Sequence, residues 1–344
     1  MKIDYTPQLD FNSVLIRPKR TTISSRSQVN LERIFTFPNT KTTWTGVPII
    51  AANMDTTGTF EVYDVLSKFK MITCFNKFYS LRDFEERDTN PLDPNYFMIS
   101  TGINEQNFCN LCDIVEATKA KWICIDVANG YMHNVVTFCD KVRATFPDCI
   151  IVAGNVATRE MVEELILNGK VDIVKCGIGP GSACLTRRKT GVGVPQLSAI
   201  IECADGAHGC GGMIIGDGGI TCPGDLAKAF GGGADFVMIG GQFAGHDENP
   251  GEIQEIDGKK FKLFYGMSSE HAMNKHYGKM ANYRSSEGRL VKVPYKGPLE
   301  VTVRDYLGGL RSACAYINAH KIKHMPKCTT FLLVNQQLNT HFGK

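Results

Sequence analysis

Ile150-Ile151-Val152-Ala153-Gly154 is a short, continuously apolar stretch that ends in a glycine, and seven other stretches of the same kind accompany it. Unbroken runs of β-branched and other apolar residues are typical of strands that are buried on both faces. The eight predicted strands occupy residues 49–52, 71–75, 96–100, 122–126, 150–154, 172–176, 213–217 and 236–240.

Segments of helical period separate most of these strands. They include residues 60–69, 135–146, 161–167 and 226–230, and a last helix is expected over 299–317. Eight strands alternating with helices predict a (β/α)8 TIM barrel in a single domain spanning residues 1–344, with the barrel at about 47–318 and extensions at both ends. An open, doubly wound parallel sheet remains the alternative, because the pattern alone does not close the sheet.

Composition and charge exclude several classes of protein. The 344 residues are 43% hydrophobic and 21% charged, with a net charge of +3, which is the balance of an ordinary globular protein rather than a disordered chain or a nucleic-acid binder. No apolar run approaches the roughly 18 residues of a membrane span, and no signal peptide opens the chain. We therefore expect a cytoplasmic protein with neither a nucleic-acid nor a membrane partner.

The 13 cysteines are odd in number, which favours free thiols over a disulfide framework. The pair Cys109 and Cys112 lies in a segment of helical pattern without a second pair at zinc-ligand spacing, so we interpret it as a helix face. Cys184 differs from the others: it lies in a glycine-rich loop and is followed by Arg187, Arg188 and Lys189, and nearby cations favour the reactive thiolate. It is the candidate nucleophile, and Thr186 either orients a reacting group or caps a turn.

Two connections are longer than the others. Residues 177–191 form an extended loop after the sixth strand, and long loops in compact domains are usually functional. After the eighth strand, residues 252–256 and 259–263 flank Asp257-Gly258, which predicts a hairpin. A polar stretch at 268–297 resembles a lid, so we expect a mobile flap over about 245–297. The tail after Lys327 is interpreted as an arm.

Active sites of barrels gather where the strands end, and these ends are rich in glycine. Backbone N–H groups of Gly218, Gly219, Gly240 and Gly241, after the seventh and eighth strands, predict a phosphate site, although any βα turn uses glycine. Asp217 would repel a phosphate but suits the two hydroxyls of a ribose. A nucleotide therefore fits this mouth better than a bare sugar phosphate.

Several long motifs in the chain resemble those of one known protein family. Gly179-Pro180-Gly181-Ser182-Ala183-Cys184-Leu185-Thr186-Arg187, followed by residues 191–196, resembles the catalytic loop of the IMP dehydrogenase/GMP reductase family. The match extends to residues 15–18, 52–55, 217–219, 224–229 and 265–268, and it covers roughly residues 9–318 in order. The regulatory (CBS) insert of IMP dehydrogenases is absent, because only about 25 residues separate the second and third strands.

Two further strings resemble the GMP reductase branch of that family. They are Thr221-Cys222-Pro223-Gly224-Asp225 and the flap sequence Asn282-Tyr283-Arg284-Ser285-Ser286-Glu287-Gly288. Lys77 also favours the GMP reductase branch. Departures are small: Leu185 and Arg188 replace expected threonines, and residues 75–78 replace an Ile-His-Lys-His type sequence.

The resemblance implies an oxidoreductase that converts GMP to IMP and ammonia with NADPH. It implies that Cys184 attacks carbon 2 of the purine, that Thr186 and Glu287 move the proton, and that Lys77 positions cofactor and substrate. It also implies a homotetramer and a potassium site formed by Gly179, Gly181, Cys184 and Arg187. By the same resemblance the substrate is held by Asp217, Gly218, Gly219, Gly240, Gly241, Gly266, Met267, Ser268, Arg284 and Gly288. The implied cofactor residues are Ser25, Arg26, Lys77, Asp126, Val127, Ala128, Tyr283, Arg284, Ser312, Ala313, Cys314 and Ala315.

Two other functions stay open from the sequence. An IMP dehydrogenase without its insert would use the same thiol and hydrolyse the adduct with water. A non-catalytic nucleotide-binding barrel would keep the fold without the reaction, although Cys184, Thr186 and Glu287 are all present.

Overall fold

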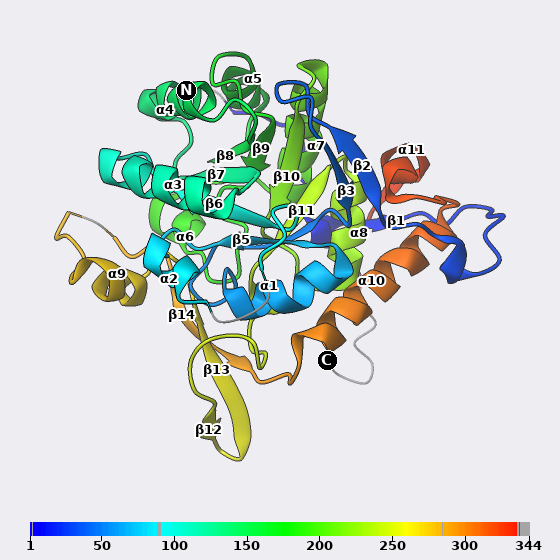
Figure 1. Cartoon of the computed structure of the whole chain (residues 1–344). Coiled ribbons are helices and arrows are strands. Elements are labelled where there is room, and N and C mark those ends of the chain that lie inside the picture. The colour runs from blue at the N-terminus through cyan, green and yellow to red at the C-terminus, as the bar shows by residue number, and fades with distance from the viewer. Residues whose placement is uncertain (2, 88–90, 284, 336, 338–344) are drawn as a thin grey trace.

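The computed structural model describes residues 1, 3–87, 91–283, 285–335 and 337. Its centre is a closed barrel of eight parallel strands, which confirms the predicted (β/α)8 fold and excludes the open sheet (Figure 1). In the order of the barrel the strands are β4 (Ile49–Ala51), β5 (Ile72–Phe75), β6 (Phe97–Thr101), β7 (Trp122–Asp126), β8 (Ile150–Val156), β9 (Ile173–Cys176), β10 (Met213–Asp217) and β11 (Phe236–Ile239).

Helices surround this barrel, and several begin where the sequence indicates. Pro223 is the first residue of α8, where its missing N–H would have no intrahelical partner. The side chain of Asn104 caps α3 by accepting a hydrogen bond from the Asn107 N–H at 2.7 Å. The surrounding helices are α1 (Phe60–Leu66), α2 (Leu81–Glu85), α3 (Glu105–Thr118), α4 (His133–Thr145), α5 (Arg159–Leu167), α7 (Gln196–Gly209), α8 (Pro223–Gly231) and α10 (Leu299–Tyr316).

One end of the barrel interior is plugged by aromatic side chains. The hairpin of β2 (Arg33–Thr36) and β3 (Thr43–Gly46) brings Phe35 and Trp44 against Trp122 and Phe236, with ring centroids 4.6–5.8 Å apart. Trp122 and Phe236 are the first residues of their strands. The plug therefore closes the amino-terminal end of the barrel, and the carboxyl-terminal end remains for the site.

The flap contains more regular structure than the sequence predicts. The expected hairpin is present as β12 (Gln254–Ile256) and β13 (Lys259–Tyr265), and it projects from the body of the molecule (Figure 1). A third strand, β14 (Leu290–Pro294), pairs with β13, and α9 (Glu270–Tyr277) lies within the stretch interpreted only as a polar lid. Likewise, the loop after β9 ends in a short helix, α6 (Thr186–Thr190).

The two terminal extensions pair with each other. Strand β1 (Val14–Ile16) runs antiparallel to β15 (Phe331–Leu333). Next to this pair, the carbonyl oxygen of Phe11 accepts hydrogen bonds from Lys228 Nζ at 2.8 Å and from Gln337 Nε2 at 2.6 Å. The Phe11 ring packs beside Gly219, where an added Cβ would lie 3.2 Å from it. Residues from both extensions thus support the loop after β10.

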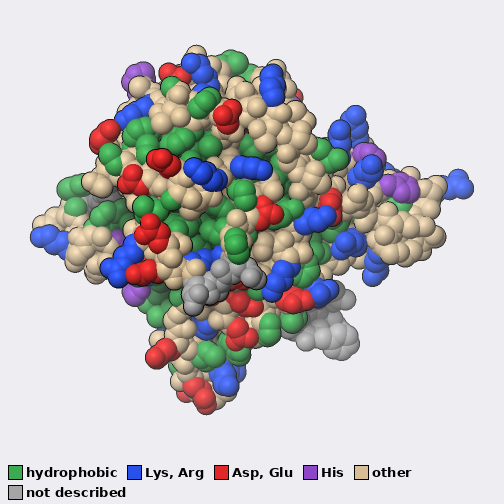
Figure 2. All heavy atoms as spheres, viewed as in Figure 1, with side chains coloured by type: hydrophobic (Ala, Val, Ile, Leu, Met, Phe, Trp, Pro, Cys, Tyr) green, Lys and Arg blue, Asp and Glu red, His purple; other side chains and the backbone are tan. Residues whose placement is uncertain are grey.

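The surface is mixed in charge. On the face shown in Figure 2, acidic and basic side chains are interspersed rather than gathered into a stripe. Among the helices that the structure describes, none is long and apolar enough to cross a membrane.

Candidate functional site

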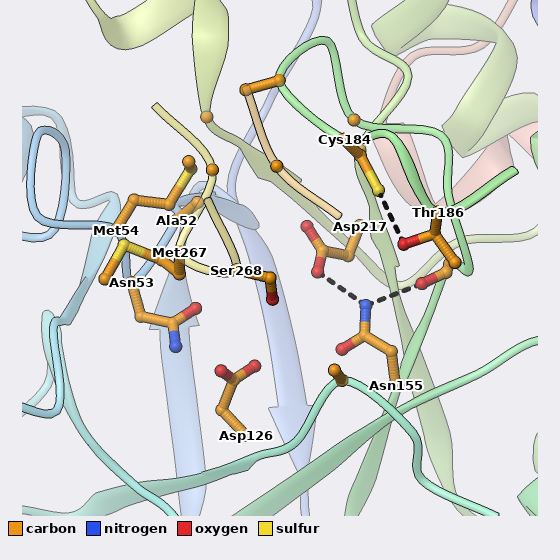
Figure 3. A pocket seen from close by; sticks show the side chains of 18 of the residues that line it. Ala52, Asn53, Met54, Asp126, Asn155, Cys184, Thr186, Asp217, Met267 and Ser268 are labelled. Carbon is orange, nitrogen blue, oxygen red and sulfur yellow. Dashed lines mark hydrogen bonds between the residues drawn. The ribbon is translucent and has the colours of Figure 1, made fainter. Parts of the chain in front are cut away.

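A cavity of about 680 Å³ opens at the carboxyl-terminal ends of the barrel strands. This volume lies within the usual range of ligand sites. The cavity brings together most of the residues that the sequence singled out, and Figure 3 shows several of them pointing into one space. The predicted residues that line it are Lys77, Asp126, Val127, Ala128, Gly179, Gly181, Cys184, Thr186, Asp217, Gly218, Gly219, Gly240, Gly241, Gly266, Met267, Ser268, Glu287 and Gly288.

A hydrogen-bonded chain connects the candidate nucleophile to a carboxylate. The Cys184 thiol donates to Thr186 Oγ1 at 3.2 Å (Figure 3), and the Thr186 hydroxyl donates to Glu287 Oε2 at 2.8 Å. Each donor thus points toward the carboxylate. This order of donors can carry a proton from the sulfur to Glu287 and return it to a group bound beside the sulfur.

The catalytic loop and the flap are joined by backbone contacts next to this chain. Cys184 and Gly288 form an isolated antiparallel β-bridge, and the Leu185 N–H donates to the Glu287 carbonyl at 2.6 Å. A Cβ at Gly288 would lie 2.7 Å from the Ser269 nitrogen, so glycine is required for this close approach. The position of Glu287 therefore depends on flap residues that the sequence separates from Cys184 by about a hundred positions.

The loop after β10 has a backbone conformation that requires glycine. Gly218 and Gly219 both have positive φ, at 90° and 81°, which side chains other than glycine rarely adopt. Gly240 and Gly241 follow the neighbouring strand β11 and line the same cavity. Exposed backbone N–H groups in such turns suit phosphate.

Asp217 is held from one side, so that its other side faces the cavity. Its Oδ2 accepts hydrogen bonds from Asn155 Nδ2 at 2.9 Å, drawn in Figure 3, and from Lys175 Nζ at 3.0 Å. Within the described residues Oδ1 has no hydrogen-bond partner, and the side chain is partly exposed to the cavity. This oxygen can accept hydrogen bonds from the hydroxyls of a sugar.

Asp126 is the second carboxylate of this mouth. Lys175 Nζ contacts its Oδ1 at 2.7 Å. Burial opposes ionisation, but the ammonium groups of Lys175 and Lys77 outweigh it and lower the pKa of Asp126. Asn155 follows the end of the predicted strand 150–154, where the sequence places it at the polar mouth but gives it no role. Sequence reasoning missed Lys175, because it lies inside the apolar segment 172–176.

A cluster around Asp55 fixes the flap helix to the barrel. Asp55 is buried, and its Oδ2 accepts hydrogen bonds from Tyr265 at 2.8 Å, Lys275 at 3.0 Å and His276 at 2.6 Å. The His276 ring stacks on Phe78, next to Lys77, with centroids 3.4 Å apart. Burial opposes ionisation, and the three donors outweigh it and lower the pKa of Asp55. Helix α9 is therefore attached to the rim of the cavity.

We expect Asp55→Asn to loosen the flap without unfolding the barrel. The three donors share one carboxylate oxygen, and the amide oxygen of asparagine carries no negative charge, so it holds the Lys275 ammonium and the other two donors more weakly. Cleavage by trypsin within residues 268–297 should become roughly fivefold faster or more, while the melting temperature of the barrel changes little. The control is Glu300→Gln, which removes an exposed ion pair with Arg304 on α10. Equal cleavage of both variants would show that Asp55 does not restrain the flap.

Several predicted residues lie away from the cavity. Ser25 and Arg26 begin the exposed turn η2 (Arg26–Gln28), which contacts α10, the helix that carries Ser312, Ala313, Cys314 and Ala315. Cys314 is fully buried. Tyr283 is exposed and does not line the cavity. Arg284 lies outside the described residues.

The loop predicted to bind potassium is braced by Arg187. Its stem packs on Gly179 and Gly193, and its guanidinium donates to the Val194 carbonyl at 2.6 Å. The carbonyl of Gly181 accepts a hydrogen bond from the Cys184 N–H at 3.0 Å. Among the described residues no group of three or more His, Cys, Asp or Glu side chains could hold a metal ion.

Comparison of the sequence with known proteins shows the family to which the chain belongs. The model of the IMP dehydrogenase / GMP reductase domain matches residues 89–339. The chain is 56% identical over 347 residues to a GMP reductase of Aeromonas hydrophila, with both chains covered fully. It is 57% identical to human GMP reductase 2 and 56% identical to mouse GMP reductase 1, each over 344 residues and 99% of both chains. The chain therefore belongs to the IMP dehydrogenase/GMP reductase family.

Proposed function

We propose that this protein is a GMP reductase, which converts GMP and NADPH to IMP, ammonia and NADP. The observation that carries the proposal is the chain from the Cys184 sulfur through Thr186 to Glu287, at the rim of a cavity that also holds Asp217 and the glycine turns. The names of the relatives support it.

In the first half of the reaction, the amino group on carbon 2 of the purine is replaced by the Cys184 sulfur. Cys184 gives its proton through Thr186 to Glu287, and the thiolate attacks carbon 2. The proton returns along the same chain to the amino group, which departs as ammonia with the electrons of the carbon–nitrogen bond. The products are ammonia and a covalent purine–Cys184 thioether.

In the second half, NADPH supplies a hydride to carbon 2 when it is bound beside the purine. The carbon–sulfur bond then breaks, the thiolate leaves with its electron pair, and IMP remains. Asp126, Val127 and Ala128 line the part of the cavity proposed for the nicotinamide, which Lys77 also lines, and the positive charge of Lys77 favours the ionised Asp126 carboxylate. Their polar and backbone groups fit a nicotinamide amide, and Lys77 would position it against the purine.

The rest of the cavity would hold the nucleotide. Gly219, Gly240 and Gly241 would bind the phosphate, and Asp217 the ribose, while Gly266, Met267, Ser268, Gly288 and Arg284 would close over the base. Ser25 and Arg26, together with residues 312–315, do not line this cavity, and they would serve the cofactor of a neighbouring subunit in a homotetramer. The reaction fits purine nucleotide salvage in the cytoplasm.

The test is the absorbance of reduced nicotinamide when the purified chain is mixed with NADPH and GMP in potassium buffer. We expect the signal to fall with GMP and NADPH, with one ammonia released per NADPH consumed. A gain of signal with IMP and NAD, and no loss with GMP, would assign the chain to the dehydrogenase reaction. No response in either mixture would favour the non-catalytic barrel.

We also expect potassium to support the rate. The carbonyl oxygens of Gly179, Gly181 and Cys184 are neutral, hard donors of the kind that alkali ions accept. An ion there would fix the loop that carries the sulfur. Replacing potassium by lithium at constant ionic strength should lower kcat by roughly tenfold, because a misplaced nucleophile loses orientation. Equal rates in both salts would contradict the assigned ion site.

A further inference from the structure

Lys175 is a buried cation in a strand that otherwise packs as core. Its neighbours Ile173, Val174 and Cys176 are fully buried and apolar, and Lys175 itself is only 3% exposed. Ile173 belongs to the cluster inside the barrel, whereas Val174 and Cys176 face the helices. Because side chains alternate along a strand, Lys175 points into the barrel interior one layer above Ile173, toward the cavity that it lines.

The Lys175 ammonium lies between two carboxylates from different strands. It contacts Asp126 of β7 at 2.7 Å and Asp217 of β10 at 3.0 Å. Burial of a lysine opposes its charge, but the two carboxylates outweigh this cost and raise the pKa of Lys175 well above its ordinary value. The two contacts therefore favour the charged form of Lys175, and each carboxylate has this ammonium as a counter-ion.

A glycine in β8, the strand between β7 and β9, leaves room for the contact between Lys175 and Asp126. In the register of the sheet, Asp126 pairs with Gly154 of β8, and Gly154 pairs with Lys175. A Cβ at Gly154 would lie 2.7 Å from the Lys175 Cβ and 2.4 Å from its carbonyl oxygen. The glycine thus leaves the space in which the Lys175 side chain reaches across β8 to Asp126.

We propose that Lys175 is a positioning residue that couples the two halves of the cavity through one shared ammonium. It holds Asp217 with Oδ1 turned to the ribose, and it holds Asp126 beside Lys77 in the nicotinamide half. This inference rests on the proposed function for the ligands involved. It assigns Lys175 no contact with substrate, because its charge acts through the two carboxylates.

The experiment measures binding rather than turnover. IMP affinity is measured by calorimetry, and NADPH affinity by its fluorescence at saturating IMP, a pair that cannot react because IMP is already the reduced purine. Lys175→Gln should weaken IMP binding at least tenfold and NADPH binding at least fivefold, and Lys175→Arg should restore most of both. The control is Lys262→Gln, another buried lysine, which donates to the carbonyls of Asp247 and Asn249 and does not line the cavity. It should change both affinities less than twofold.

Double variants separate positioning from general damage. When Asp217 is already Asn, Lys175→Gln should change IMP affinity less than twofold. When Asp126 is already Asn, it should change NADPH affinity less than twofold, while IMP affinity still falls about tenfold. If Lys175→Gln alone fails to fold, the charge-balanced pair Lys175→Gln/Asp126→Asn, compared with Asp126→Asn, gives the same IMP measurement.

The outcomes separate the two proposals. Equal losses in every background would show a merely structural lysine and overturn the inference. So would a Lys175→Gln variant that binds both ligands as the unaltered chain does. If the unaltered chain does not bind IMP, the proposed function fails, and this inference fails with it.

Discussion

Replacing Cys184 by alanine will abolish GMP reduction while GMP binding persists. The thiol is the atom that forms the bond to the purine, and removal of a nucleophile that acts as a unit with its proton relay lowers kcat by about 10⁴-fold or more. The cavity walls are unchanged by the loss of one sulfur, so the dissociation constant of GMP should stay within about threefold. The measurements are steady-state NADPH consumption and calorimetry with GMP.

The matched control is Cys109→Ala, an exposed thiol on α3 outside the cavity. It should retain full activity. If Cys184→Ala keeps more than about a hundredth of the rate, the covalent route is wrong, and a direct displacement on the purine would have to replace it. Mass spectrometry of the unaltered chain quenched with GMP and without NADPH should show the purine adduct on the peptide that contains residue 184.

Glu287→Gln will lower the rate of GMP reduction, because it slows the step in which ammonia is released. The amide keeps the size of the carboxylate and its contact with Thr186, but it cannot take up and return the proton. Loss of such a general acid–base group costs about 10²–10⁴-fold. Single-turnover experiments should show slow ammonia formation, and the dissociation constant of NADPH should change little.

Glu255→Gln serves as the control, because Glu255 lies on the exposed hairpin strand β12. It should leave every rate unchanged. A Glu287→Gln variant with normal ammonia release and slow hydride transfer would contradict the assigned role and would place Glu287 with the cofactor instead.

The sequence was sufficient for the barrel because each strand carries its own signal. An unbroken run such as Ile150 to Ala153 is apolar on both faces, and each run ends in, or is followed by, a glycine or polar residue at the mouth. The flap was less predictable. The residues of β14 alternate, but their partner β13 is chosen by tertiary contacts some thirty residues away, and α6 has five residues, of which three are basic.

The residues of the candidate site also fall into those that the sequence indicates and those that it does not. Cys184, Thr186 and the glycine turns could be identified because they stand in loops, where their chemistry is conspicuous. The Asp55 cluster joins residues more than 200 positions apart, so no local pattern indicates it. The role of Lys175 could not be predicted, because a single lysine in an apolar run has the same pattern as a strand that only packs in the core.

The contact of Gln337 and Lys228 with the Phe11 carbonyl has a consequence for synthesis of the chain. During translation the segment around Phe11 leaves the ribosome more than 300 residues before its partners β15 and Gln337. The Phe11 ring beside Gly219 therefore gains this support only after all eight barrel strands have been made. The barrel strands can therefore pair before the loop after β10 is supported by both extensions, and this support closes a contact of long sequence separation, which is slow to form.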